Sequence, residues 1–226
     1  FSLLAFGEVL NVAFWVNMLS VISSAFTVLF TFWAITLLGR KLLKTTNPEG
    51  LDNYILVAAG MIGSLALTFS DTFWFSAGEA EVYAMSSFFT AFAFWAILKW
   101  ELIENQAAAN RWLIMIAYTM GLSTGVHLLN LLTIPAIGLV IYFKYYKPNA
   151  RGIIVTLLIS AAIILTVLEF VIKGLPTIAS KFEIIFINSL GLPFGTGVLI
   201  FFILFIAALI YGIYYSIQKN NVVLNT

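Results

Sequence analysis

The sequence predicts an all-helical protein that crosses a membrane several times, and three observations support this fold class. Of the 226 residues, 62% are hydrophobic and only 9% are charged, and the mean hydropathy is +1.04. A soluble domain carries about 45–50% apolar and about 25% charged residues, so lipid must be the solvent for much of this surface. Apolar runs of about 20 residues, enough to cross a hydrocarbon core of about 30 Å as a helix, also recur along the chain. We therefore expect an all-α polytopic transmembrane helical bundle that forms a single domain over residues 1–226.

Apolar runs place the expected spans in order, and there are about seven of them. The stretch from Trp112 to Phe143 is too long for one ordinary span and short for two. Gly121, Gly125 and Pro135 interrupt it, as they would a broken helix or a pair of short helices. The expected spans cover residues 12–38, 53–70, 82–99, 112–126, 128–143, 152–172 and 198–217.

The distribution of basic residues decides between one and two crossings in 112–143. Cytoplasmic loops of membrane proteins are enriched in Lys and Arg. Two crossings place nine of the eleven basic residues on the cytoplasmic side, leaving only Lys173 and Lys181 outside. One crossing would separate Arg111 from the cluster at 144–151, so we predict two. The nine residues are Arg40, Lys41, Lys44, Lys99, Arg111, Lys144, Lys147, Arg151 and Lys219.

Small and polar residues within the spans predict helix packing. A stripe of them in the first span recurs every three or four residues, so it faces protein rather than lipid; it comprises Asn17, Ser20, Ser24, Thr27 and Thr31. Gly60-x-x-x-Ser64 and Gly121-x-x-x-Gly125 are spaced for close helix approach. Glu169 and Lys173, four residues apart, are expected to pair.

An acidic segment, residues 70–83, joins the second and third expected spans on the outer side. Asp71, Glu79 and Glu81 lie here with no balancing Lys or Arg, so a bound cation or a substrate hydroxyl could offset their repulsion. If the segment is helical, Trp74, Gly78 and Glu81 share a face, which places a carboxylate beside an aromatic ring, as in many carbohydrate sites. The alternative is a solvated acidic loop with Trp74 at the membrane interface.

His127, the only histidine, lies between two apolar half-helices, with Asn130 on the same helical face. Ionisable residues at membrane depth are candidates for function. The alternative is a structural histidine that holds the helix break in place. One histidine and distant carboxylates match no metal-ligand spacing, and there is no cysteine. We expect no metal site, no cofactor and, at a net charge of +1, no nucleic-acid partner.

Two of these segments together resemble a family of GT-C membrane glycosyltransferases, the protein O-mannosyltransferase-like proteins. This family is common in Bacteroidota and includes the eukaryotic ER enzyme that mannosylates plexin-type IPT domains. The resemblance covers roughly residues 1–145. The matching residues are Asn17 to Ser20, Phe73-Trp74, Glu81-Val82-Tyr83, Gly121-Leu122, Gly125, His127 and Pro135.

The resemblance implies transfer of a hexose such as mannose from a polyprenyl-phosphate donor to a Ser or Thr hydroxyl of an exported protein. It implies that Glu81 and Glu79 bind hydroxyls, that Trp74 and Tyr83 shape the sugar pocket, and that His127 meets the donor phosphate. We include Asp71 and Asn130 among the expected substrate-binding residues. The expected partners are membrane lipid, a lipid-linked sugar and the acceptor protein.

The family pattern places an outer loop containing an Asp, and then a His-Pro-Pro-Gly element, ahead of the span that opens this chain. Neither is present, so we expect an internal piece of a longer enzyme that is inactive alone, with the main base in the missing segment. The expected location is a bacterial inner membrane, with the site facing the periplasm.

The alternative function is a fragment of a secondary transporter or lipid flippase. The broken helix and the intramembrane ionisable groups fit this class equally well. The position of the polar groups separates the two functions. A transporter keeps them near the membrane midplane with access to both sides, whereas a glycosyltransferase gathers them at one side.

Overall fold

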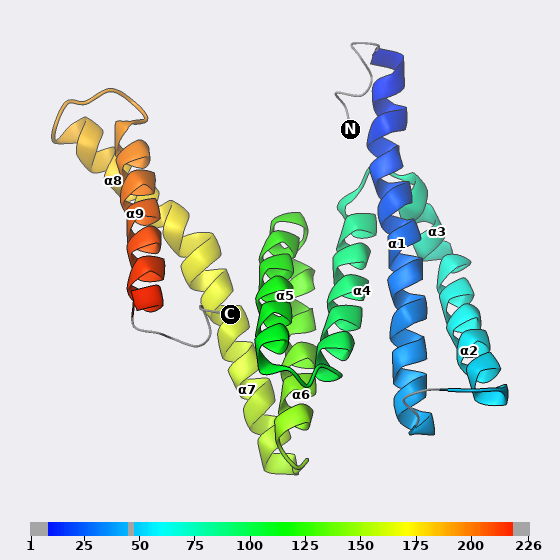
Figure 1. The fold of residues 1–226 in the computed structure, drawn as a ribbon. Helices are drawn as coiled ribbons and strands as arrows, with labels where there is room; N and C mark the ends of the chain where they lie inside the picture. Colours follow the sequence, from blue (N-terminus) through cyan, green and yellow to red (C-terminus); the bar gives the residue numbers. More distant parts are fainter. Residues whose placement is uncertain (1–8, 45–47, 219–226) are drawn as a thin grey trace. The chain divides into compact units, whose positions relative to one another are not determined.

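In the computed structural model, which describes residues 9–44 and 48–218, the chain is a series of helices joined by short connections (Figure 1). The predicted all-α membrane bundle is confirmed: the described residues contain no strand, and six segments are long and apolar enough to cross a membrane. The elements are α1 (Val9–Leu43), α2 (Leu51–Thr68), α3 (Asp71–Gly78), α4 (Val82–Glu101), α5 (Gln106–Val126), η2 (Leu128–Leu132), α6 (Thr133–Tyr145), α7 (Ala150–Thr166), η3 (Val167–Gly174), α8 (Leu175–Asn188) and α9 (Thr196–Gln218).

The predicted break in the stretch 112–143 is present, since α5 ends at Val126 and α6 begins at Thr133. The six candidate spans of the described chain include Leu128–Tyr145 but not α5, one fewer than the seven we expected. The reason is that α5 begins with Gln106 and carries Asn110 and Arg111 in its first two turns, which lowers its hydropathy.

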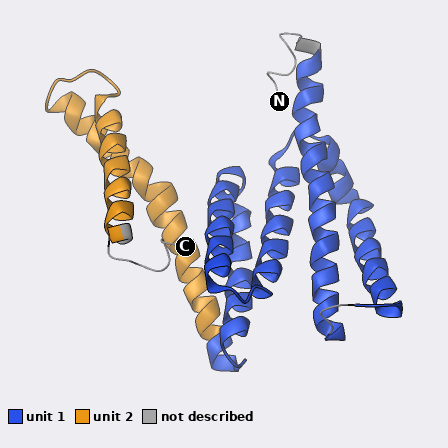
Figure 2. Cartoon of the chain, viewed as in Figure 1, with its two compact units in different colours: residues 1–153 blue, residues 154–226 orange. Residues whose placement is uncertain are grey.

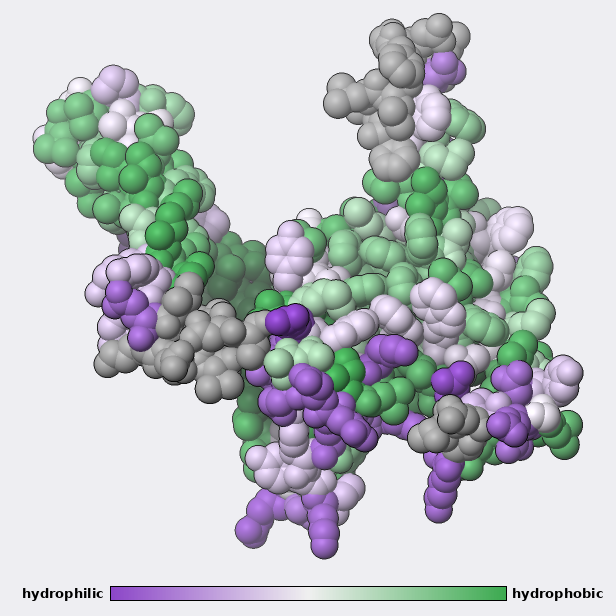
Figure 3. Space-filling model, in the orientation of Figure 1, coloured by the Kyte–Doolittle hydropathy of each residue, from purple (hydrophilic) through white to green (hydrophobic). Residues whose placement is uncertain are grey.

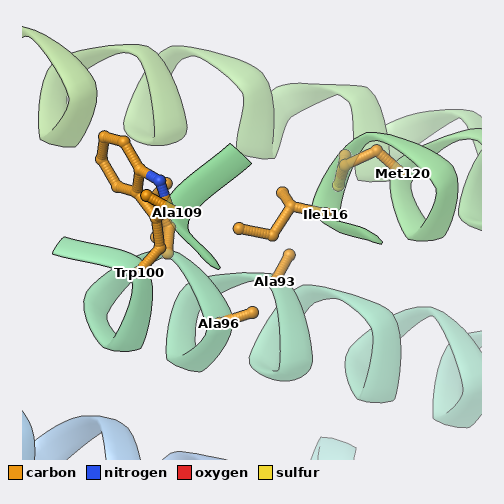
Figure 4. Close-up of a cluster of buried hydrophobic side chains, with 7 residues drawn as sticks. Ala93, Ala96, Trp100, Ala109, Ile116 and Met120 are labelled. Carbon is orange, nitrogen blue, oxygen red and sulfur yellow. The ribbon is translucent and has the colours of Figure 1, made fainter. Parts of the chain in front are cut away.

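The chain divides into two compact units, residues 1–153 and 154–226 (Figure 2). In unit 1, α4 packs against α1, α5 and α6. Small side chains of α4 let α5 approach closely, and Figure 4 shows Ala93 and Ala96 facing Ile116 of α5. Trp100 closes this apolar cluster near the last turn of α4 and is fully buried. The cluster fixes the position of α4 relative to α5. The start of α4 and the end of α5 are therefore held close together, and residues at both contribute to the site described below.

The polar stripe of α1 packs inward as predicted: Ser20, Ser24 and Thr27 are all buried. The close approach at Gly60 is also confirmed, because a Cβ there would lie 2.8 Å from the Phe32 ring and 2.9 Å from Thr36 Cγ2. The close approach at Gly121 and Gly125 is wrong. No atom lies within 4 Å of a Cβ at either position, because both glycines face open space at the end of α5.

Charged groups gather at one end of unit 1, which we call the basic end; Figure 3 shows the hydrophilic side chains collected there. Lys41, near the end of α1, pairs with Glu101 at the end of α4. Lys144, near the end of α6, donates hydrogen bonds to the carbonyls of Trp100 (3.1 Å) and Ile103 (2.8 Å). Its ammonium also lies 4.3 Å from the Trp100 ring centroid. The ends of α1, α4 and α6, which the charge pattern placed on one side, are therefore together. Lys219, which the same prediction placed on this side, lies outside the described residues.

Unit 2 contains a helical hairpin. The helix that begins at Ala150 continues to Asn188, well beyond the expected end at residue 172. It passes Pro176 because the preceding stretch, η3, is π-helical, which accommodates the missing N–H. The predicted Glu169–Lys173 pair is confirmed as a salt bridge. Glu183 of α8 accepts hydrogen bonds from the backbone N–H groups of Gly195 and Val198, the latter at 2.9 Å, and so caps the start of α9.

Candidate functional site

A cavity of about 580 Å³ lies at the end of unit 1 opposite the basic end. Its wall includes Ser20 of α1, Glu81 and Tyr83 where α4 begins, and Gly125 and Val126 where α5 ends. Three helices that are separate in sequence therefore contribute to one cavity, which we call the Glu81 cavity. Its lining includes the last four residues of the acidic segment, 80–83, and the two residues directly before His127.

Glu81 lies on extended backbone rather than on a helix. α3 ends at Gly78, a residue that disfavours helix, and the backbone at Glu79 and Glu81 is extended, with ψ values of 142° and 166°. The predicted single helical face of Trp74, Gly78 and Glu81 is therefore wrong. Glu81 is the N-cap residue of α4, yet its carboxylate does not bond to the helix. The fold thus leaves this exposed carboxylate available to a ligand.

Glu79 lies at the other end of the same short connection. It is exposed and follows the last residue of α3. Its backbone carbonyl accepts a 2.8 Å hydrogen bond from the N–H of Glu81, which makes a tight turn around Ala80. The turn keeps the two carboxylates two residues apart on one short segment, of which Ala80 and Glu81 line the cavity and Glu79 does not.

Tyr83 and His127 meet across the helix ends: their ring centroids are 5.5 Å apart at an interplanar angle of 46°. His127 follows α5 directly and is the N-cap residue of η2. Its Nδ1 accepts a hydrogen bond of 3.2 Å from the N–H of Leu129. A ring nitrogen that accepts an N–H carries no proton, so the proton of neutral His127 is on Nε2. Nε2 is therefore a donor that a ligand can use.

Asn130 is almost completely buried, with 2% of its surface exposed. Its Oδ1 accepts hydrogen bonds from Ser86 (2.6 Å) and Thr90 (3.2 Å), and its Nδ2 donates to the Ser123 carbonyl at 3.1 Å. These bonds tie the turn after His127 to both α4 and α5. Asn130 therefore holds the helix break in place, and the fixed break in turn positions His127.

Asp71 and Trp74 lie on α3 and do not line the Glu81 cavity. Asp71 is in the first turn of α3, where a carboxylate is favourable beside the helix dipole. Trp74 is 60% exposed, and its ring stacks on Phe69 with centroids 6.0 Å apart. The structure therefore places Glu81 and Tyr83 in one cavity and His127 against the Tyr83 ring. The side chains of Glu79, His127 and Trp74 are not among the residues that line the cavity.

The contribution of α1 to this cavity was not expected. Ser20 lines it, although the stripe pattern assigned Ser20 to helix packing alone. The signal that could have identified it is the Asn17-to-Ser20 element, which matches the family pattern. A larger cavity, of about 770 Å³, lies in unit 2 between η3, α8 and α9, but none of the predicted site residues lines it. Within the described residues, no three His, Asp or Glu side chains are grouped to hold a metal ion.

A family model described as the protein O-mannosyl-transferase TMEM260 N-terminal domain matches residues 1–150. This range holds the whole Glu81 cavity and all the predicted site residues. No curated protein and no solved structure matches the chain.

Proposed function

Because the chain belongs to the family of the protein O-mannosyl-transferase TMEM260 N-terminal domain, we propose that it is the membrane core of a GT-C glycosyltransferase. It transfers a hexose such as mannose from a polyprenyl-phosphate donor to a Ser or Thr hydroxyl of an exported protein. The acceptor oxygen attacks the anomeric carbon, the bond from that carbon to the phosphate oxygen breaks, and the acceptor proton passes to a carboxylate. The lipid phosphate leaves as the second product.

The observation that carries this proposal is the Glu81 cavity at one end of unit 1. A lipid-linked donor presents its sugar at the membrane surface, so its site must have polar groups at a helix end. Glu81 and Tyr83 are such groups, and they border a space of about 580 Å³. In the proposal, Glu81 and Glu79 bind hydroxyls of the sugar or the acceptor, and Tyr83 forms part of the sugar pocket. The cavity faces the outer side of the membrane, which is the periplasm in a bacterium.

The position of these groups also favours transfer over transport. A transporter site lies near the midplane, where both sides of the membrane can reach it in turn. Glu81 and His127 instead directly adjoin the ends of α4 and α5. Asn130, the buried polar residue among the predicted site residues of the acidic segment and the helix break, is committed to hydrogen bonds within the protein.

The test is an assay of the full-length enzyme in membranes supplied with a radiolabelled polyprenyl-phosphate hexose and a Ser/Thr-rich acceptor protein. We expect label on the acceptor, released by mild alkali as an O-linked sugar. The same hexose supplied as a nucleotide sugar, in membranes without the polyprenyl carrier, is the control and should give none. Movement of the labelled lipid across the membrane without any labelled protein would favour the flippase alternative instead.

His127 is expected to contact the donor phosphate through Nε2. In a His127→Asn variant, the Asn oxygen can still accept the N–H of Leu129, because Asn is a good N-cap residue. The shorter side chain does not reach the phosphate, and losing a hydrogen bond to a charged group costs about 1.5–3 kcal/mol. We therefore expect transfer to fall about 10- to 100-fold at unchanged thermal stability.

The His127→Ala variant separates the two parts that His127 plays. It removes both the cap and the donor, so it should lose activity and also melt at a lower temperature. Full activity of the His127→Asn variant would show that His127 acts only on the helix break.

A further inference from the structure

Gly125 is the position at which the backbone of α5 itself forms part of the wall of the Glu81 cavity. It lies in the last turn of α5 and is exposed, and together with Val126 it forms the part of the wall that α5 contributes. Since glycine has no side chain, the wall at Gly125 consists of main-chain atoms alone. A ligand in the cavity can therefore approach the helix backbone directly at this position.

Two common reasons for a glycine do not apply to Gly125. Its φ is not positive, since the described glycines with positive φ are Gly50, Gly191 and Gly195. Within the described residues, no neighbouring helix requires the absence of a side chain, because a Cβ at Gly125 would meet nothing within 4 Å. A third reason for glycine is the close approach of a ligand to the backbone. Because Gly125 also lines the cavity, this third reason fits the structure.

Gly121 shares these properties but lies elsewhere. It is one turn earlier on the same face of α5, is also exposed, and a Cβ there would also meet nothing within 4 Å. Gly121 does not line the Glu81 cavity. A substitution at Gly121 therefore has the same effect on the helix as one at Gly125 but leaves the cavity unchanged.

The groups around Gly125 accept hydrogen bonds. The Glu81 carboxylate makes no bond to α4, and an ionised carboxylate can only accept. The Gly125 carbonyl lies in the last turn of α5 and so has no partner within that helix. Carboxylate and carbonyl oxygens pair with hydroxyl groups and repel the oxygens of a phosphate. With the Tyr83 ring in the same wall, this part of the cavity suits a sugar rather than a phosphate.

We propose that the transferred sugar lies against the backbone at Gly125, and that any side chain at this position excludes it. The sugar hydroxyls donate to the Glu81 carboxylate and to main-chain carbonyls at the end of α5. The phosphate and the lipid chain of the donor lie outside this contact. The inference rests on the proposed function for the identity of the donor, and it adds the position of the sugar within the cavity.

The test is equilibrium binding to the purified full-length enzyme with two radiolabelled ligands, polyprenyl-phosphate mannose and polyprenyl phosphate without a sugar. In a Gly125→Ala variant, we expect binding of the mannose-bearing lipid to weaken at least about tenfold, as for one methyl group too many in a fitted pocket. Binding of polyprenyl phosphate should not change, because the new methyl group meets only the sugar. Gly121→Ala is the matched control and should leave both affinities at the wild-type value.

Thermal stability separates an effect on the cavity from damage to the helix. Alanine favours helix over glycine, and both substitutions meet open space, so both variants should melt at or above the wild-type temperature. Weaker sugar binding in a variant of equal or higher stability therefore reports on the cavity.

Wild-type affinity of the Gly125→Ala variant for the mannose-bearing lipid would overturn the inference. An equal loss for both lipids would also overturn it, because the substitution would then act on the phosphate or the lipid chain. An equal loss in Gly121→Ala would show that a helix packs across both glycines instead. The transfer assay reports separately on the proposed function. Sugar-dependent binding without transfer would contradict that function and leave Gly125 in a sugar site, whereas transfer with normal binding by Gly125→Ala would do the reverse.

Discussion

Replacing Glu81 with Gln is expected to lower sugar transfer by the full-length enzyme about 10- to 100-fold while leaving the fold intact, because a sugar or acceptor hydroxyl loses its hydrogen bond to a charged group, which costs about 1.5–3 kcal/mol. The side chain does not cap α4, so the fold makes no use of its charge there. Gln keeps the size of the side chain and removes its charge. The measurements are the rate of label transfer to the acceptor protein and the melting temperature of the purified variant.

Glu104→Gln is the matched control for Glu81. Glu104 is also exposed and lies between two helices, but in the connection from α4 to α5 at the basic end. The substitution removes the same charge far from the Glu81 cavity, so transfer should stay at the wild-type rate. Wild-type turnover by the Glu81→Gln variant would remove Glu81 from the site, and equal losses in both variants would point to a general effect of charge.

Replacing Gly197 with Ala is expected to have the largest effect on stability. A Cβ at Gly197 would lie 2.5–2.7 Å from backbone atoms of Phe182 and Glu183, which cannot rotate away as a side chain can. The first turn of α9 must then move off α8, and the bonds from Gly195 and Val198 to Glu183 break with it. Overpacking of this kind costs about 1–3 kcal/mol, and the lost cap adds about 1 kcal/mol. Thermal unfolding in detergent should show a lower melting temperature.

Gly212→Ala is the control on the same helix. No atom lies within 4 Å of a Cβ at Gly212, so the substitution meets no obstacle. Alanine favours helix over glycine by about 1 kcal/mol, so α9 should keep or slightly gain stability. If Gly197→Ala melts at the same temperature as Gly212→Ala, the close packing of α8 on α9 is not the contact that holds the hairpin together.

Local chemistry explains which features the sequence could predict. The helical class, most of the spans and the gathering of basic residues at one end follow from hydropathy and charge. The burial of Ser20, Ser24 and Thr27 against neighbouring helices follows from their spacing of three or four residues along α1. The break near His127 follows from Gly125 and Pro135, because these residues weaken a helix wherever it packs.

The errors arose where neighbouring helices decide the outcome. Gly121 and Gly125 have the spacing of a helix contact, but no helix packs on them at the end of α5. The helix that begins at Ala150 outlasts its expected end because the π-helical stretch accommodates Pro176. Neither outcome is visible in the residues concerned, since each depends on the backbone geometry around them.

The sequence by itself determined that this protein is a helical membrane protein, which residues carry ionisable groups, and that its first 145 residues resemble O-mannosyltransferase-like proteins. Only the tertiary structure decided that Tyr83 lies between its two partners, sharing a cavity with Glu81 and a ring contact with His127, while the Trp74 ring stacks elsewhere. It also decided that Asn130 is buried in a hydrogen-bond network. The physical reason is that amino-acid composition and the spacing of apolar residues determine the structure of a single segment. The meeting of α1, α4 and α5 depends instead on where each helix ends and on how Ala93, Ala96 and Trp100 pack between them.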